Sequence, residues 1–247
     1  MIVVPEGSAL LLVTQPDHAH FSGELLSLWR AGGLPAHPRR EELIFAAREH
    51  DNGWREADAA PRWDAGRGRP HDFISLPTRE RIEIWERGTC RFAHERPYAA
   101  LLVTRHALNL FGGRREDEEW APLIAFLDEF EASLLAETGV PREELEADYR
   151  LIDLADLISL AACSRWREPV ERYGFSVEPR DGTVGLDPLP LAGSTTFRVP
   201  CRRIPNRVYR GDADLGGELA AARWEELSLR VVEAAENAEA VEVNSTP

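Results

Sequence analysis

The chain of 247 residues is long enough for one sizeable domain, and its 43% content of hydrophobic residues is sufficient for a packed core. It has 43 acidic and 29 basic residues, a net charge of −14, which argues against a general nucleic-acid or anionic-membrane surface. All 29 basic residues are arginine, which excludes a P-loop lysine, a Schiff-base lysine and a pyridoxal-phosphate anchor. This composition is compatible with a small-molecule substrate, including a phosphorylated one, and with a homo-oligomeric assembly.

The cysteines and the hydrophobic runs indicate the cellular compartment of the protein. Cys90, Cys163 and Cys201 are odd in number and lack Cys-x-x-Cys spacing, so they indicate neither a disulfide framework nor a zinc ribbon. No apolar run approaches the roughly 18 residues of a membrane span, and the run at residues 10–13 lacks the basic segment of a signal peptide. These features predict a protein of the reducing cytoplasm.

The chain begins with two short apolar runs, residues 2–4 and 10–14, which predict a β-hairpin around a Pro-Glu-Gly-Ser turn. Helical periodicity follows in six segments: residues 17–31, 39–51, 79–95, 97–111, 117–138 and 143–167. Residues 52–78, rich in Gly, Pro, aromatic residues and Arg, predict a long loop, a type of segment that is often functional in compact domains. The middle of the protein is therefore expected to be a helical bundle.

The composition changes near residue 171, where Gly, Pro and β-branched residues become more frequent. Strands are expected at residues 195–199, 207–210 and 227–232, as a β-rich appendage over 171–232 packed on a core of residues 1–170. The Ala- and Glu-rich tail 233–247 has no helical apolar stripe and is expected to be disordered. The predicted fold class is mainly α, with a short N-terminal hairpin and a C-terminal β appendage.

His50 and Asp51 end the apolar face of a predicted helix, because Leu43, Ala47 and His50 follow helical spacing. Burying an imidazole and a carboxylate is costly unless both have a partner. A metal ion satisfies both, since imidazole nitrogen and carboxylate oxygen are ligands for Fe, Mn, Zn and Ni. We therefore expect a metal site near the end of this helix.

His18 shares a helical face with Ser22 and Leu25 and is expected to point inward, whereas His20 falls on another face. His106 lies on an inward line with Val103 and also needs a buried partner. Each inward histidine has two interpretations, a metal ligand or a core residue hydrogen-bonded to the backbone.

Asp153 and Asp156 share one face of a nearly all-apolar helical segment, where an unpaired carboxylate is disfavoured. One of them can ligate a cation while the other orients a ligand histidine. Pairing with an arginine such as Arg150 or Arg165 is the structural alternative.

The order of one histidine, a His-Asp doublet, a further histidine and a distant aspartate resembles the HD-domain superfamily of metal-dependent phosphohydrolases. More narrowly, four segments look like those of a bacterial family of unknown function with an HD-like core: Gln15-Pro-Asp-His18, His50-Asp-Asn-Gly-Trp54, Leu101-Leu-Val-Thr-Arg-His106 and Asp156-Leu-Ile-Ser-Leu160. The resemblance covers about residues 1–170 and most of the appendage, and it implies that the helical bundle has the HD-domain arrangement.

The resemblance implies that His18, His50, Asp51 and Asp156 form the first metal shell, with His106 as a further ligand or a substrate contact. One or two divalent metal ions, Fe, Mn, Zn or Ni, are the implied cofactor, and the implied reaction is hydrolysis of a phosphoester of a small metabolite or nucleotide. In that reaction Asp51 would orient or deprotonate water, and His106 would protonate the leaving group or hold the substrate.

HD hydrolases often use a lysine near the metal, and this chain has none. An arginine of the loop could supply that positive charge, since guanidinium binds phosphate in a bidentate fork, while most of the loop arginines are expected to be solvated at the surface. The arginines available for this in the loop are Arg55, Arg62, Arg67 and Arg69. Asn52 and Trp54 follow the doublet and would border a metal cavity, so both are predicted with Arg55 to contact substrate.

Two other functions are compatible with the same residues. A di-iron oxygenase of the HD type would need further nitrogen ligands from His71, His94 and His106. A non-catalytic metal- or ligand-binding protein would instead have a closed coordination sphere.

Overall fold

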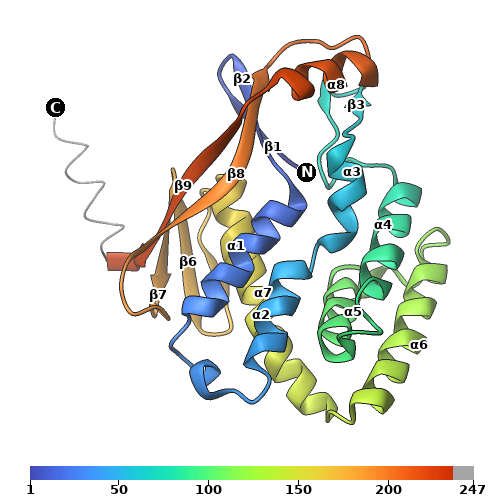
Figure 1. Ribbon diagram of the computed structural model, residues 1–247, viewed down its shortest axis with the longest axis vertical. Coiled ribbons are helices and arrows are strands. Elements are labelled where there is room, and N and C mark those ends of the chain that lie inside the picture. Colours follow the sequence, from blue (N-terminus) through green and yellow to red (C-terminus); the bar gives the residue numbers. More distant parts are fainter. Residues whose placement is uncertain (236–247) are drawn as a thin grey trace.

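The computed structural model describes residues 1–235 and shows an α/β fold, with 50% of the residues in helices and 21% in strands. Figure 1 shows a long curled sheet on one side and helices α4, α5 and α6 on the other. The prediction of a mainly α, HD-like helical bundle with a small β appendage is therefore wrong. The physical reason is that the N-terminal hairpin and the C-terminal strands pair with each other in one large sheet instead of forming separate small elements.

The helices are α1 (Gln15–Leu28), α2 (Arg40–Glu49), α3 (Arg55–Ala59), α4 (Thr78–Cys90), α5 (Pro97–Phe111), α6 (Ala121–Thr138), α7 (Arg142–Cys163) and α8 (Asp212–Ala221), with 3-10 turns η1 (Leu34–Ala36), η2 (Asn52–Trp54) and η3 (Gly112–Arg114). The strands are β1 (Ile2–Glu6), β2 (Ala9–Val13), β3 (Trp63–Asp64), β4 (Arg69–Pro70), β5 (Val170–Arg172), β6 (Phe175–Arg180), β7 (Thr183–Asp187), β8 (Thr195–Pro205) and β9 (Trp224–Glu233).

Seven strands form the main sheet in the order β1-β2-β8-β9-β7-β6-β5. All neighbours are antiparallel except β7 and β9, which pair in parallel. Along β8 buried and exposed residues alternate, so one face of the strand meets the core and the other meets solvent. On the buried face Phe197 packs against Phe21 of α1, with ring centroids 4.7 Å apart. The sheet thus holds α1 in place.

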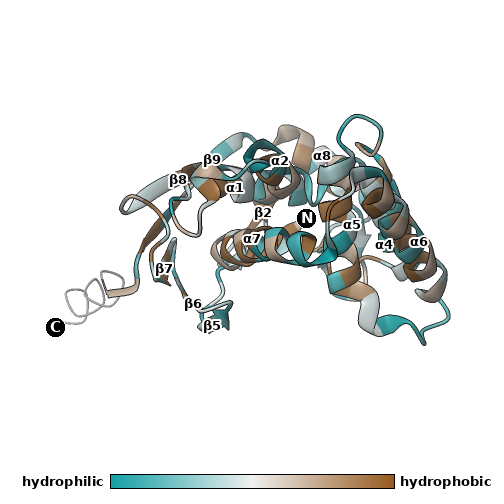
Figure 2. Ribbon diagram, turned by 90° about the horizontal axis from the view of Figure 1, so that it is seen from below, coloured by the Kyte–Doolittle hydropathy of each residue, from teal (hydrophilic) through white to brown (hydrophobic). Residues whose placement is uncertain are grey.

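Helix α7 lies at the centre of the fold. It contacts β6 and β7 on one side and α1, α2 and α5 on the other. Figure 2 shows the same arrangement from below, with α7 between the sheet and the group formed by α4, α5 and α6. Residues Ile152, Ala155 and Ile158 are fully buried in this position. A polar side chain on α7 is therefore fixed by both layers of the protein.

The six predicted helices and the N-terminal hairpin are confirmed, with ends shifted by a few residues. The predicted loop 52–78 is wrong in part, because it contains η2, α3 and the small β3–β4 hairpin. The strand predicted at residues 207–210 is wrong: Arg207 there forms ion pairs with Asp214 and Glu218 of α8, a helix that we did not predict. Strands β5, β6 and β7 were not predicted either.

The division at residue 170 stays a prediction, although strands from both sides of it share the main sheet. Of the predicted disordered tail 233–247, Glu233 ends β9, and residues 236–247 lie outside the described residues. None of the helices in residues 1–235 is both long and apolar enough to cross a membrane.

The turn η2, which follows the His-Asp doublet, packs directly on α4 at Gly53. A Cβ atom built on Gly53 would lie 2.2 Å from the carbonyl oxygen of Ile84 and 3.1 Å from the Cα of Gly88. Asn52 reinforces the contact by donating from Nδ2 to the carbonyl oxygens of Glu49 (2.8 Å) and Gly88 (2.9 Å). A glycine is required here because two backbones approach each other closely.

We expect Gly53→Ala to destabilise the protein by about 1–3 kcal/mol, since the added methyl group must push two backbone segments apart. Gly113→Ala is the matched control, because a Cβ at Gly113 meets no atom within 4 Å and its φ is not positive. Denaturant unfolding followed by circular dichroism measures both free energies. Equal stability of the two variants would contradict the close-packing interpretation.

Candidate metal centre

Side chains from four helices meet at the end of α2. His18 comes from α1, His50 is the C-terminal cap of α2 with Asp51 directly after it, His106 comes from α5 and Asp156 from α7. The three histidines are at most 2% exposed and Asp51 is 5% exposed. The structure therefore brings all five predicted metal ligands together in the interior.

His50 occupies the middle of this group. Its Nδ1 donates a hydrogen bond to the carbonyl oxygen of Ala47 (2.8 Å), so this nitrogen carries the proton. Its Nε2 lies 3.2 Å from Asp156 Oδ1 and 3.6 Å from Asp51 Oδ2, is buried, and makes no hydrogen bond within residues 1–235. A neutral imidazole would point its lone pair at two carboxylates, so the geometry requires a cation, either a proton on Nε2 or a metal ion.

The carboxylate of Asp51 is oriented by two neighbours from α1. Its Oδ2 accepts hydrogen bonds from His18 Nε2 (2.8 Å) and Gln15 Nε2 (3.1 Å). The other nitrogen of His18, Nδ1, lies 2.9 Å from the hydroxyl oxygen of Ser159, which is itself 2.8 Å from that of Ser22. Such hydrogen bonds behind a ligand fix the orientation of its ring.

A second chain of hydrogen bonds orients His106. The hydroxyl of Tyr149 donates to Asp153 Oδ1 (3.3 Å), so its oxygen accepts from His106 Nδ1 (3.2 Å). The lone pair of His106 is thereby left on Nε2, which lies 3.9 Å from Asp156 Oδ2. His106 thus presents a ligand atom toward the same carboxylate that His50 faces.

The two aspartates of α7 have separate partners. Asp153 accepts hydrogen bonds from Arg172 of β5 (2.8 Å) and from the Tyr173 hydroxyl (2.8 Å). Asp156 faces the histidines, with no arginine among the ion pairs that it forms in the described chain. The arginine alternative therefore applies to Asp153, although with Arg172 and not with the predicted Arg150 or Arg165.

The electrostatics of the cluster couple the imidazoles to the carboxylates. Burial by itself would lower the pKa of His50, but the charges of Asp51 and Asp156 outweigh it and raise the pKa to about 9. Burial would raise the pKa of Asp156, yet the charge of His50 outweighs it and holds this pKa well below its usual range. Burial lowers the pKa of His106, which therefore favours the neutral, ligating form.

The residues fit a divalent metal ion. One ligand atom from each of His18, His50 and Asp156 lies within 4.8 Å of the others, and the same is true of His50, Asp51 and His106. The set of imidazoles and carboxylates is that of Fe, Mn, Zn and Ni sites. Together with the two carboxylates that face the buried Nε2 of His50, this set supports a metal centre.

A cavity of about 210 Å³ opens onto the cluster. Its polar lining residues are Gln15, His18, Asp51, Trp54, Arg81, His106 and Asp156, and its apolar lining residues are Phe73, Ile74, Trp85, Leu110, Phe111 and Leu160. Four of the candidate metal ligands therefore line a solvent-accessible cavity, an arrangement that a catalytic metal site requires.

The three residues predicted to contact substrate lie in different places in the structure. Trp54 lines the cavity, and its buried indole nitrogen has no hydrogen-bond partner within the described residues. Asn52 is instead directed at α4, as described above, and Arg55 pairs with Glu49 away from the cavity. Of the three, only Trp54 is placed to touch a molecule bound beside the cluster.

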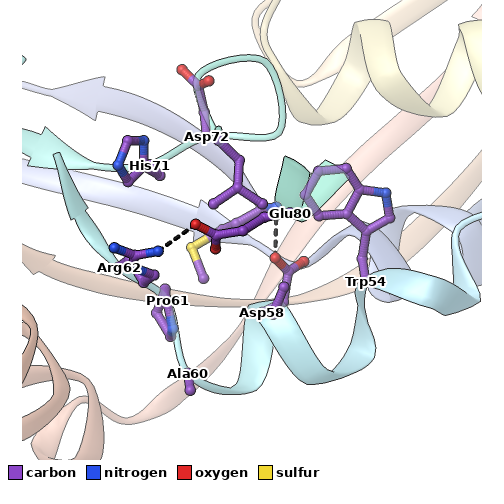
Figure 3. Close-up of a pocket in the computed structure, with 11 residues that line it drawn as sticks. Trp54, Asp58, Ala60, Pro61, Arg62, His71, Asp72 and Glu80 are labelled. Carbon is purple, nitrogen blue, oxygen red and sulfur yellow. Dashed lines mark hydrogen bonds and ion pairs between the residues drawn. The ribbon is translucent and has the colours of Figure 1, made fainter. Parts of the chain in front are cut away.

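The other arginines of the predicted loop are also paired with carboxylates. Arg67 and Arg69 both pair with Asp72, and Arg62 pairs with Glu80 in a smaller cavity on the other side of Trp54, shown in Figure 3. His71 lines that second cavity, 3.6 Å from Asp64. His94 is exposed. Neither of these two histidines joins the cluster.

The sequence predictions missed two residues of the site, Ser159 and Arg81. Ser159 lies three positions after Asp156, so helical spacing could have placed it beside the ligands. Arg81 precedes the buried residues Ile84 and Trp85 by three and four positions, and the same spacing could have placed it on the inner face of α4.

The chain belongs to the family described as protein of unknown function (DUF3891), whose model matches residues 1–206. All five cluster residues lie inside the matched region. No curated protein matches the chain. No solved structure matches it either.

We expect purified protein to contain near-stoichiometric transition metal and the variants His50→Ala and Asp156→Ala to lose it. Plasma mass spectrometry on protein prepared without a histidine tag or chelator measures this. His94→Ala, which changes an exposed histidine outside the cluster, should retain the metal. A wild-type protein that takes up no Fe, Mn, Zn or Ni on reconstitution would show that the cluster is purely structural.

Asp153→Asn and Asp156→Asn should have opposite effects. Asp153→Asn removes the charge that Arg172 and two tyrosines bind, so it should cost about 1.5–3 kcal/mol of stability and leave the metal bound. Asp156→Asn should remove the metal with a smaller effect on the stability of the metal-free protein. Unfolding of chelator-treated samples and metal analysis together test this, and metal loss in Asp153→Asn alone would reverse our assignment.

Proposed function

We propose that this member of the DUF3891 family is a metal-dependent hydrolase that cleaves a phosphoester of a small phosphorylated metabolite. The observation that carries the proposal is that Arg81 lines the same cavity as His18, Asp51, His106 and Asp156 of the candidate ligand cluster. A metal-ligand cluster open to solvent beside a cation suits an anionic substrate. The ordered set of His18, the His-Asp doublet and Asp156, which resembles that of the HD superfamily, supports the same reaction.

The bound metal would supply Lewis acidity, lowering the pKa of water to give a nucleophile near neutral pH and polarising a phosphoryl oxygen. Asp51 lines the cavity, and its Oδ2 is fixed by Gln15 and His18, so its carboxylate is suited to orient a water molecule or accept its proton. We assign His106 as a ligand or substrate contact in preference to a proton donor, because its pKa is lowered and Tyr149 fixes the lone pair on Nε2.

The di-iron oxygenase alternative receives less support. It would need two further nitrogen ligands drawn from His71, His94 and His106, and of these His71 and His94 lie outside the cluster. The non-catalytic alternative, a metal-binding protein with no open ligand position, is opposed by the cavity that reaches Asp51, His106 and Asp156. Oxygen uptake by iron-loaded protein, or bound metal without turnover, would favour the first or the second alternative respectively.

The reconstituted protein should release inorganic phosphate from members of a panel of small phosphomonoesters and phosphodiesters, and chelation should abolish this activity. Asp51→Asn should lower kcat by roughly 10²- to 10⁴-fold, the usual contribution of a general base. Asp181→Asn, which changes an exposed carboxylate at a turn, should retain full activity. Equal phosphate release by wild type and Asp51→Asn, or none from any ester with metal bound, would contradict the proposal.

A further inference from the structure

The cavity beside the cluster combines one unpaired cation with a largely apolar wall. We propose that it selects a substrate with a single phosphate group on a compact apolar or aromatic group, with Arg81 binding the phosphate and Trp85, Leu110 and Ile74 contacting the apolar part. This inference rests on the proposed function for the chemistry that follows binding. The binding preference itself is testable without turnover.

The guanidinium of Arg81 has no carboxylate partner in the described part of the chain. Its Nε is buried without a hydrogen-bond partner, and none of the ion pairs formed among residues 1–235 includes it. The guanidinium instead lies over the ring of Trp120, 5.1 Å from the centroid, with Arg114 over the same ring at 4.6 Å. A half-buried arginine beside another arginine, without a carboxylate partner, is suited to bind an anion.

The charge of Arg81 is left uncompensated by its surroundings. Burial lowers the pKa of its guanidinium, Arg114 lowers it further, and Glu119 only partly offsets this. The neighbouring Arg79 differs, because it is exposed and pairs with Glu83 on the outer surface of α4. Helix α4 thus places Arg81 in the lining of the cavity and Arg79 on the outer surface.

The apolar wall has two parts. At its base the rings of Trp85 and Phe111 meet edge to face, with centroids 5.5 Å apart. At its mouth Ile74 and Leu110 are 63% and 47% exposed, although both line the cavity. Large apolar side chains exposed at the rim of a cavity favour a ligand that covers them. The polar side chains of the cluster would then face the phosphate end of the bound substrate.

The size and charge of the cavity argue against longer, more highly charged substrates. Its volume of about 210 Å³ is below the roughly 300–1,000 Å³ of most small-molecule pockets. One arginine, Arg81, is among the residues that line the cavity. Asp51 and Asp156, which also line it, contribute negative charge. A second or third phosphate would therefore lack a cationic side chain in this cavity.

Binding of phosphonates to the metal-loaded protein tests the inference. Phenylphosphonate, which cannot be hydrolysed as an ester, is titrated against methylphosphonate and pyrophosphate by calorimetry, with fluorescence of the cavity residues Trp54 and Trp85 as a second readout. We expect phenylphosphonate to bind at least tenfold more tightly than either competitor. Leu110→Ala should reduce this preference while leaving methylphosphonate affinity unchanged.

Arg81→Gln should weaken phenylphosphonate binding at least tenfold with no loss of metal, and Arg79→Gln is the matched control that should change neither. Binding of methylphosphonate or pyrophosphate as tight as that of phenylphosphonate would overturn the substrate class. Unchanged affinity in Arg81→Gln would overturn the assignment of the arginine.

The two proposals fail in different ways. If phenylphosphonate binds through Arg81 but phenyl phosphate is not hydrolysed, the binding inference stands and the hydrolase proposal falls. If phosphate esters are hydrolysed with no preference for an apolar group and no dependence on Arg81, the hydrolase proposal stands and the inference about substrate class falls.

Discussion

The arrangement of the interior depends on two carboxylates, Asp51 and Asp156, which lie 3.6 Å and 3.2 Å from Nε2 of His50. Two buried negative charges that face the same imidazole nitrogen are strongly unfavourable without a cation between or beside them. In the ion-free protein a proton on His50 supplies it, consistent with the raised pKa of that imidazole. A metal ion bound at the same place would supply the same positive charge without rebuilding the fold.

The candidate ligands were predictable because each is polar at a position where helical periodicity requires an apolar residue. His18, His50, His106 and Asp156 all interrupt inward faces, and the structure brings them together. The choice between Asp153 and Asp156 was not predictable, since they share a helical face and their partners come from elsewhere. Arg172, which binds Asp153, belongs to β5, and its position depends on pairing within the sheet.

The sheet was predicted least well, for identifiable reasons. Asp181 and Gly182 separate β6 from β7 and are a recognised hairpin signal, so this turn was readable from the sequence. Pro179 and the charged residues of β5 and β6 weaken the β pattern on either side. The parallel pairing of β7 with β9 joins segments far apart in the chain, and local periodicity carries no information about such a contact.

The large sheet and the candidate metal centre are connected through α7. Asp153 accepts hydrogen bonds from Arg172 and Tyr173 at the edge of the sheet. Tyr149, one turn earlier, donates its hydroxyl hydrogen to Asp153 and accepts a hydrogen bond from His106 Nδ1. Asp156, nearly one turn later, faces His50. Asp153, which anchors α7 to the sheet, and Asp156, which belongs to the cluster, are thus less than one turn apart on one rigid helix. Because α7 is packed on both sides, the sheet fixes where the ligands lie, and the helical half of the protein alone would leave His106 and Asp156 without that constraint.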